Sequence, residues 1–160
     1  MGKKDEKTNV MRVLEQKKIR YNSYTYEPDA TLTGEDIANI LNEDPKKVFK
    51  TLLTTNGKNE YFVFMIPVTG ELDLKKAAKA VGAKSIEMLK AKDLLPLTGY
   101  VHGGCSPIGM KKLFKTTVHE TAAGFDTIMY SGGKVGFQVE TTPKDLESVI
   151  PLQYADVIKE

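Results

Sequence analysis

The chain has 160 residues, 41% hydrophobic and 28% charged, which is typical of a globular domain with its own core. Its 23 basic and 21 acidic residues give a net charge of only +2, too small by itself to indicate a nucleic-acid-binding protein. A single cysteine excludes an internal disulfide framework. The polar start MGKKDEKTN and the lack of an apolar run of ~18 residues argue against a signal peptide and a membrane span. We expect one cytoplasmic domain over residues 1–160, with residues 1–8 frayed.

Caps and alternating patterns predict the elements of the first half. In chain order they are a helix from Thr8 or Asn9 to about Lys18, a strand over residues 21–27, a helix opened by Thr33 and Asp36, a helical turn at Asp44-Pro45, and a β-hairpin over residues 48–67. In the first strand, Tyr24 and Tyr26 share one face. The Asn56-Gly57 pair inside the hairpin is typical of a type I′ turn or a close relative of it.

The second half is predicted to mix helices with short strands. In chain order the elements are a helix from Asp73 to Gly82, a short helix opened by Ser85, a shaped loop over residues 99–109, strands at KLFKTTVH and FDTIMYS, a turn at residues 131–134, a strand at GFQVE, a helix from Thr142-Pro143 to about Ile150, and a final strand at YADVI. The hairpins over residues 48–67 and 125–140 are antiparallel, which favours a mixed sheet over a doubly wound parallel one. We expect a mixed α/β (α+β-like) fold: a single domain with a mostly antiparallel, curved or barrel-like sheet of about seven strands, flanked by helices.

Lys50 interrupts the apolar run VFKTLL at residues 48–53. Because side chains alternate along a strand, Lys50 shares a face with Val48 and Leu52, and Thr51 points to the opposite face. Lysine on an edge strand often serves only to prevent association of sheet edges. The apolar neighbours and the central hairpin instead favour a partly buried amine that donates hydrogen bonds or acts as an acid or base. The spacing alone leaves both interpretations open.

Three residues, His102, Cys105 and His119, are the candidates for metal binding or nucleophilic catalysis. A structural zinc site usually needs four such ligands, so we expect no metal site. Cys105 beside either histidine could act as a nucleophile, but a free cysteine beneath a glycine loop is more often a small buried hydrophobe. The sequence has no Gly-x-Ser-x-Gly elbow, Walker A motif or Gly-x-Gly-x-x-Gly fingerprint, which argues against serine hydrolases, nucleotide hydrolases and dinucleotide-binding proteins.

The loop HGGCSPIG, residues 102–109, is the most informative motif that the residues alone provide. Without a Cβ, Gly103 and Gly104 let backbone amides approach a ligand closely, as in an anion nest or an oxyanion hole. Ser106 adds a hydroxyl group, and Pro107 stiffens the end of the loop. A purely structural turn remains an equally good interpretation.

Four blocks of the sequence resemble, in the same order, the YbaK/EbsC family of aminoacyl-tRNA deacylases, which includes the editing domain inserted in bacterial prolyl-tRNA synthetases. The blocks are Asp44-Pro45 with FKTLL at 49–53, LDLKKAAKAVGAK at 72–84, TGYVHGGCSPIGMKK at 98–112, and SGGKVGFQVE at 131–140 followed by Pro143 and Asp145-Leu146. The resemblance covers nearly the whole chain and implies a mixed α/β domain with a curved or barrel-like sheet and a site without metal or cofactor.

The resemblance also implies functional residues. The family's FKT lysine, the residue most closely tied to activity, corresponds to Lys50, and the backbone amides of Gly103 and Gly104 would face the ester carbonyl, so these three are the expected catalytic positions. The expected substrate-binding residues are Tyr24, Thr33, Thr51, Ser106, Pro107, Ser131 and Gln138. Relatives typically carry an aspartate in place of Gln138 and often an aromatic residue in place of Thr33. These departures concern the preferred amino acid more than the class of reaction.

By this resemblance, the chain is expected to be a trans-editing hydrolase that deacylates mischarged tRNA, most of all Cys-tRNA(Pro). The thiol of the substrate would attack its own carbonyl to form a thiolactone, whereas an Ala-tRNA(Pro) substrate would need a positioned water. Expected partners are tRNA(Pro) and prolyl-tRNA synthetase, and no membrane. Lysines that could contact tRNA phosphates are Lys75, Lys76, Lys79, Lys84, Lys111 and Lys112. The alternative from another class is a binding module that senses tRNA ends or small nucleotides without turnover, and a fragment of prolyl-tRNA synthetase is disfavoured by the compact length.

Overall fold

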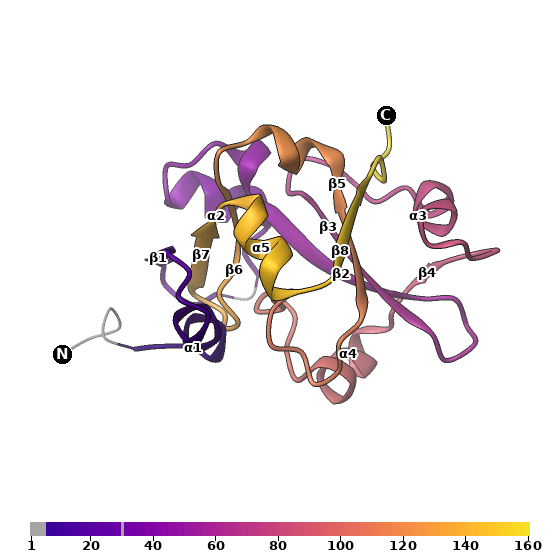
Figure 1. Cartoon of the computed structure of the whole chain (residues 1–160), viewed down its shortest axis with the longest axis horizontal. Helices are drawn as coiled ribbons and strands as arrows, with labels where there is room; N and C mark the ends of the chain where they lie inside the picture. Colours follow the sequence, from indigo (N-terminus) through magenta and orange to yellow (C-terminus); the bar gives the residue numbers. More distant parts are fainter. Residues whose placement is uncertain (1–5, 30) are drawn as a thin grey trace.

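The computed structural model describes residues 6–29 and 31–160 and shows a mixed α/β fold (Figure 1). Its helices are α1 (Asn9–Gln16), α2 (Gly34–Ile40), α3 (Leu74–Val81), α4 (Ala91–Thr98) and α5 (Pro143–Val149), with the short 3-10 helices η2 (Pro45–Lys47) and η3 (Glu120–Gly124). Its strands are β1 (Asn22–Thr25), β2 (Phe49–Thr55), β3 (Tyr61–Pro67), β4 (Glu87–Met88), β5 (Lys115–His119), β6 (Ile128–Ser131), β7 (Phe137–Thr141) and β8 (Leu152–Ala155).

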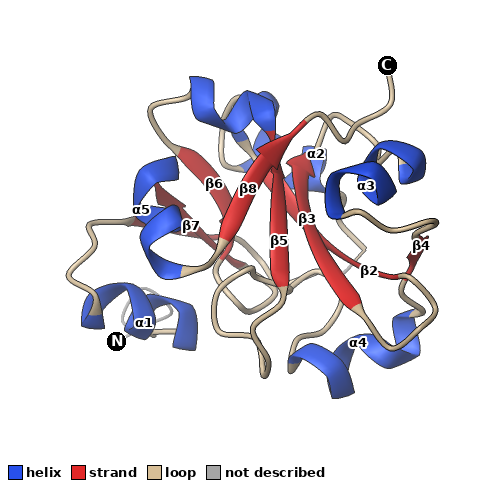
Figure 2. Cartoon of the chain, turned by 45° about the vertical axis from the view of Figure 1, so that its right-hand side comes forward, coloured by secondary structure: helices blue, strands red, loops and turns tan. Residues whose placement is uncertain are grey.

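The strands form two sheets rather than one. The order β1-β7-β6 makes an antiparallel sheet of three strands, and the order β4-β2-β3-β5-β8 makes a sheet of five, in which β3, β5 and β8 are parallel (Figure 2). A parallel bridge between Val48 and Met129 joins them. The expected mixed, mostly antiparallel pairing is confirmed. The expected count of seven strands and the barrel-like sheet are not, because the described residues contain eight strands in two sheets that do not close.

Three apolar clusters hold the layers together. The largest joins α1 and α5 to one face of both sheets through residues such as Leu14, Phe49 and Tyr130. A second packs α3 against the other face of the five-stranded sheet, with Phe64 buried completely. A third places Ala38 of α2 on Val48 and Met129, at the junction of the sheets. Since burial of a large apolar side chain contributes ~2 kcal/mol, these clusters fix how the strands of the two sheets meet.

Local signals were accurate for several helices. Thr33 caps α2 in a complete capping box with Asp36, and α3 begins after Asp73 and ends at Gly82, whose φ is 74°. Thr8 caps α1 and is buried. Of the segment 1–8, which the sequence predicts to fray, residues 1–5 lie outside the described residues, and Lys7 forms an ion pair with Glu15 at 2.8 Å.

Two local predictions were wrong. Ser85 does not open a helix: Glu87 and Met88 instead pair with Thr55 and Thr54 at the edge of β2, so strand pairing overrides the cap signal, and the next helix begins only at Ala91. The hairpin connection is also longer than a two-residue turn. It spans residues 56–60, because the side-chain oxygen of Asn56 accepts the Lys58 N–H and holds a wider loop.

Within the described part of the chain, no helix is long and apolar enough to cross a membrane.

Candidate functional site

A row of polar side chains crosses the junction of the two sheets. Tyr24 of β1 lies opposite Gln138 of β7, and Gln138 lies opposite Ser131 of β6. Residues directly opposite each other in a sheet project to the same face. Lys50 and Ser131 both follow the parallel Val48–Met129 bridge by two residues, so Lys50 extends the row onto β2. We call Tyr24, Gln138, Ser131 and Lys50 the polar row.

Lys50 is half-buried, and its ammonium has no hydrogen-bond or ion-pair partner among the described residues. This isolation differs from neighbouring Lys47, which is paired. The strand β2 keeps one continuous register from Phe49 to Thr55, so Thr51 projects to the face opposite Lys50. The Thr51 hydroxyl is buried without a partner in the described part of the chain. The strand is therefore regular at the point where both side chains were expected to line one pocket, and only Lys50 belongs to the row.

Next to the row, four side chains donate hydrogen bonds to the buried carboxylate of Glu140. Tyr24 Oη and Asn22 Nδ2 donate to Oε1 at 2.8 and 3.2 Å, and Lys47 Nζ and Thr127 Oγ1 donate to Oε2 at 2.6 and 2.5 Å. The residue is only 7% exposed. These donors come from β1, from η2 and from the segment before β6, so one carboxylate connects the segments that carry Tyr24, Lys50 and Ser131.

The hydrogen bonds decide the ionisation of this cluster. Burial alone would raise the pKa of Glu140, but the hydrogen bonds from Lys47, Thr127, Tyr24 and Asn22 outweigh burial and lower the pKa to about 2. Burial and the neighbouring Glu140 carboxylate raise the pKa of Tyr24 to about 12. At neutral pH, Glu140 is thus an anion that only accepts hydrogen bonds, and Tyr24 is a neutral phenol that donates a hydrogen bond to it.

Gln138 differs from its neighbours in the row because its buried carbonyl oxygen, Oε1, has no hydrogen-bond partner among the described residues. The side chain is 5% exposed. A buried polar atom without a partner costs ~1–3 kcal/mol, and native proteins contain few of them. Ser131, by contrast, accepts a hydrogen bond from Gly133 N–H at 3.1 Å. Among the described residues, the row therefore includes a buried acceptor without a partner, on Gln138, and a cation without a partner, on Lys50.

The glycine loop packs against the turn that follows Ser131. A Cβ on Gly104 would lie 3.0 Å from the backbone nitrogen of Val135, so a larger residue there would require the backbone at Lys134 and Val135 to shift by a few tenths of an ångström. The Gly104 N–H donates to the Val101 carbonyl at 3.0 Å and is not available to a ligand. Gly103 is exposed, with φ of 87°, and its N–H has no partner among the described residues. Of the two amides expected to face a carbonyl, only that of Gly103 is free to do so.

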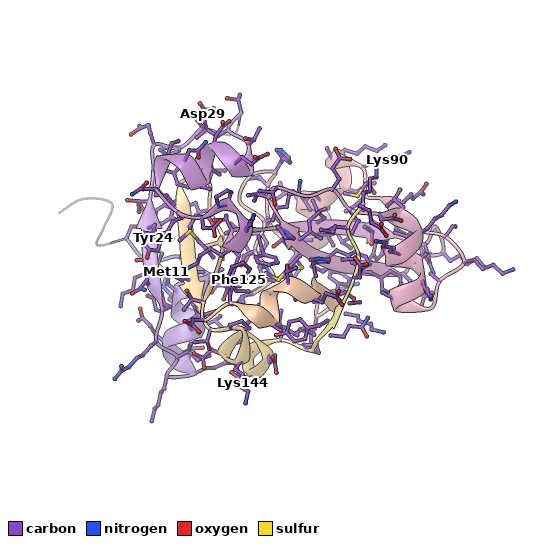
Figure 3. The ribbon with its side chains drawn as sticks, turned by 90° about the horizontal axis from the view of Figure 1, so that it is seen from above. Met11, Tyr24, Asp29, Lys90, Phe125 and Lys144 are labelled. Carbon is purple, nitrogen blue, oxygen red and sulfur yellow. The ribbon has the colours of Figure 1, made fainter. Side chains whose placement is uncertain are left out.

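Four of the expected substrate-binding residues lie outside the row, and one of them is Thr51, which projects to the opposite face of β2. The Thr33 hydroxyl accepts the Asp36 N–H at the start of α2. Ser106 and Pro107 are buried inside the glycine loop, where Ser106 Oγ accepts the Ile108 N–H at 3.3 Å. The structure thus gathers Tyr24, Gln138, Ser131 and Lys50 in one row and places Thr33, Thr51, Ser106 and Pro107 outside it. Figure 3 labels Tyr24 at the end of the molecule that carries the three-stranded sheet, far from Lys90 before α4.

Among the described residues, no hydrogen bond joins Cys105 to His102 or His119. Burial raises the pKa of Cys105 to about 12, so its thiol is protonated at neutral pH and is a poor nucleophile. His102 is exposed in the loop, and the Nδ1 atom of buried His119 accepts the Val157 N–H at 3.3 Å. In the described residues, no group of three or more His, Cys, Asp or Glu side chains is arranged to hold a metal ion.

The sequence did not indicate Glu140 or three of its donors, Asn22, Lys47 and Thr127. The segment FQVE alternates apolar and polar residues, which usually means one buried and one solvated face. In β7 both faces are buried. The available signal was the position of Glu140, two residues after Gln138 and on the same face, which makes it a neighbour of the row in any register.

Two surface hollows lie outside the row. One, of about 430 Å³, runs along α3 and is lined by Lys75, Lys79 and Lys84 together with apolar residues, and no acidic residue lines it. The other, also about 430 Å³, lies between the start of the glycine loop and the β6–β7 turn and is lined by Tyr100, Lys134 and their neighbours. Neither is lined by a residue of the polar row.

Comparison with known proteins gives a consistent result. The pattern of the family described as "Aminoacyl-tRNA editing domain" matches residues 28–149. A protein of Enterococcus faecalis named as a candidate Cys-tRNA(Pro)/Cys-tRNA(Cys) deacylase, EbsC, is 44% identical over 97% of this chain and 95% of its own length. A proline–tRNA ligase of Fervidobacterium nodosum is 30% identical over 49% of this chain but only 14% of the ligase. A crystal structure described as a candidate trans-editing enzyme for prolyl tRNA synthetase has the same fold, with a TM-score of 0.81 at 22% identity over 97% of this chain and 100% of that one.

Proposed function

The chain belongs to the family of aminoacyl-tRNA editing domains, and from that premise we propose that it releases the amino acid from mischarged tRNA, with Cys-tRNA(Pro) as its main substrate. The relative from Enterococcus faecalis supports this substrate because the similarity extends over nearly the whole of both chains. The observation that carries the proposal is the polar row, in which the unpaired ammonium of Lys50 and the unused acceptor of Gln138 project to one face. An aminoacyl ester needs both, a donor for its oxygens and an acceptor for its amino group.

Lys50 and the Gly103 amide are the donors that we assign to the ester end of the substrate. When a carbonyl carbon is attacked, negative charge develops on its oxygen, and one correctly placed donor lowers the barrier by ~3 kcal/mol. The aminoacyl ester is already an activated acyl group, so positioning and charge stabilisation suffice. This agrees with a site in which Cys105 is buried and protonated rather than poised as a nucleophile.

For a cysteinyl substrate, we propose that its own sulfur attacks its ester carbonyl. A carbon–sulfur bond forms, the bond between the carbonyl carbon and the ribose oxygen breaks, and the thiol proton ends on that oxygen. The products are free tRNA and a thiolactone, which takes up one water molecule to give cysteine. An alanyl substrate has no such sulfur, so its release requires a water molecule as the attacking group.

The tRNA and its synthetase are the partners that follow from this function. The partial match to a proline–tRNA ligase supports a link to prolyl-tRNA synthetase, which we propose supplies part of the selection for tRNA(Pro). The compartment that we propose is the cytoplasm, where tRNA is charged and used.

The deciding experiment is a deacylation panel. Purified protein is incubated with Cys-tRNA(Pro), Ala-tRNA(Pro), Pro-tRNA(Pro) and Cys-tRNA(Cys), and the released amino acid is measured against spontaneous hydrolysis. We expect Cys-tRNA(Pro) to be cleaved fastest and Pro-tRNA(Pro) to remain intact. Binding of these tRNAs without release of any amino acid would instead identify a module that senses tRNA ends.

A further inference from the structure

The β1–β7 end of the polar row carries two oxygen atoms side by side. Tyr24 and Gln138 are direct partners across the two strands, so both side chains project to the same face. The Gln138 Oε1 atom is buried without a partner in the described part of the chain. The Tyr24 hydroxyl donates a hydrogen bond to Glu140 Oε1 at 2.8 Å.

Glu140 determines which hydrogen-bonding role is left for Tyr24. The Glu140 carboxylate accepts hydrogen bonds from Lys47, Thr127 and Asn22 and has no proton of its own to donate. The phenol of Tyr24 must therefore be the donor in its contact with Glu140. The oxygen of Tyr24 then offers lone pairs to the site and has no proton left for a ligand. The buried position of Glu140, 7% exposed, and its four donors hold this arrangement in place.

We propose that Glu140 is a positioning residue that makes the β1–β7 end of the row an acceptor site, and that this site binds the α-ammonium of the aminoacyl group. This inference rests on the proposed function. Tyr24 and Gln138 supply the two acceptors, and Lys50, at the opposite end of the row, faces the ester and the ribose phosphate.

The chemistry of the substrate favours this orientation over its reverse. An aminoacyl ester has one group with several donors, the ammonium, and several acceptors, which are the ester oxygens, the ribose and the phosphate. A Lys50 ammonium facing the substrate ammonium would place like charges together. Two acceptors facing the ester oxygens would leave all of these oxygens without donors. Only the orientation with the ammonium at Tyr24 and Gln138 and the ester at Lys50 gives both ends of the substrate suitable hydrogen-bond partners.

The test compares the best substrate of the deacylation panel with its deamino analogue, for example 3-mercaptopropionyl-tRNA in place of Cys-tRNA. This analogue keeps the ester and the thiol and lacks only the amino group. Rates are measured in single turnover with enzyme in excess. Relative to the spontaneous hydrolysis of the same ester, we expect the wild-type protein to accelerate cleavage of the deamino ester roughly tenfold to hundredfold less than that of the aminoacyl ester, the loss expected for a hydrogen bond to a charged group.

Variants separate positioning from folding. Glu140→Gln, which can turn an N–H toward Tyr24, and the milder Tyr24→Phe should slow cleavage of the aminoacyl ester roughly tenfold and leave the deamino rate unchanged. A loss of folded protein would lower both rates in equal proportion, so their ratio reports the site alone. The matched control is Glu147→Gln, which removes the carboxylate that accepts the Tyr154 hydroxyl at 2.7 Å on α5 and β8, and it should leave the ratio at the wild-type value.

Gln138 provides the second arm of the test. Gln138→Glu keeps an acceptor at this position and should retain activity on the aminoacyl ester, whereas Gln138→Leu should lose roughly tenfold. If the deamino ester is cleaved too slowly to follow, this pair of variants decides. Equal wild-type accelerations of both esters over their spontaneous hydrolysis, an unchanged ratio in Glu140→Gln, or an active Gln138→Leu would overturn the inference while deacylation itself stands. Absence of cleavage of every aminoacyl-tRNA would instead remove the proposed function.

Discussion

Two glutamines on two sheets show how differently this molecule treats the same side chain. Gln153 of β8 donates from Nε2 to the Ala80 carbonyl at 2.9 Å and to Thr117 Oγ1 at 3.0 Å, and so ties β8 to α3 and β5. Gln138 of β7 is buried, yet its Oε1 atom has no partner among the described residues. The protein uses the first amide for its own structure and leaves the second open.

The difference extends to the surroundings of each glutamine. Around Gln153, polar groups such as His119 and Thr117 have partners within the protein. Around Gln138, the row includes an unpaired cation on Lys50, while the adjacent Glu140 has its acceptors filled by four donors. A folded chain rarely leaves buried polar groups unpaired without a use. The junction between the three-stranded sheet and β2, where Gln138 and Lys50 project to one face, is therefore the region that we propose for the ligand, and the remainder of the five-stranded sheet supports it.

The largest expected effect concerns Lys50. If the open region carries the reaction, Lys50→Ala should lower kcat/KM for Cys-tRNA(Pro) by roughly 10²–10³-fold, the loss typical of a missing donor to a developing oxyanion. The melting temperature should change little, because Lys50 has no partner to lose among the described residues. The contrasting variant is Cys105→Ala, whose thiol is buried and protonated, and it should retain activity. Normal activity in the lysine variant would contradict the assignment.

The second effect concerns stability in acid and tests Glu140, whose hydrogen bonds connect β1 with η2 and the segment before β6. The pKa of Glu140 in the folded protein, about 2, lies below its ordinary value of 4.5. The ionised carboxylate thus stabilises the fold above about pH 4.5, and this contribution is lost as the pH falls toward 2. Its size is about 3 kcal/mol.

Urea unfolding of wild-type protein and Glu140→Gln between pH 7 and pH 2 measures this contribution. The difference in unfolding free energy between the two proteins should be constant above about pH 4.5 and should shrink below it, because Glu140 becomes protonated and releases Lys47, Thr127, Tyr24 and Asn22. Other carboxylates titrate in both proteins and cancel in the difference. A difference that stays constant down to pH 2 would refute the depressed pKa.

The third effect tests the two glutamines directly. Gln153→Leu should lower the free energy of unfolding by about 1–2 kcal/mol, since it removes two hydrogen bonds, and should leave kcat/KM unchanged. Gln138→Leu should do the reverse, with roughly tenfold lower activity and equal or higher stability, because it removes an unpaired buried oxygen. Circular dichroism melts and the deacylation assay on both variants are the measurements. If Gln153→Leu and Gln138→Leu changed stability and activity in the same way, the proposed difference between the two glutamines would be wrong.

The sequence predicted the parts of this fold whose causes are local. The caps at Thr33 and Asp73 and the two antiparallel hairpins depend on a few neighbouring residues, and all of them were found. The helix expected from Ser85 failed because a distant strand edge pairs with Glu87 and Met88. The two sheets could not be told from one barrel, since the bridge between them joins Val48 to Met129, far apart in the chain.

For the candidate site, the sequence indicated the four residues of the polar row but not how they are arranged. The family resemblance named Tyr24, Lys50, Ser131 and Gln138, but their gathering into one row depends on three registers that no local pattern fixes. Glu140 was missed because strand alternation looks the same whether the polar face is covered by protein or by water.

The smallest expected effect concerns the groove along α3, on the five-stranded side. Lys75, Lys79 and Lys84 line this groove of about 430 Å³, which contains no acidic residue. If it follows the tRNA backbone while the acylated end lies in the polar row, changing all three lysines to alanine should raise KM roughly threefold to tenfold and leave kcat unchanged. The slope of log affinity against log salt should fall by about 2–3, since each phosphate contact contributes ~0.7–0.9. The matched control changes the exposed Lys17, Lys58 and Lys144, which line neither hollow, and should keep the wild-type slope. Equal slopes in the two triple variants would contradict a contact between this groove and the tRNA backbone.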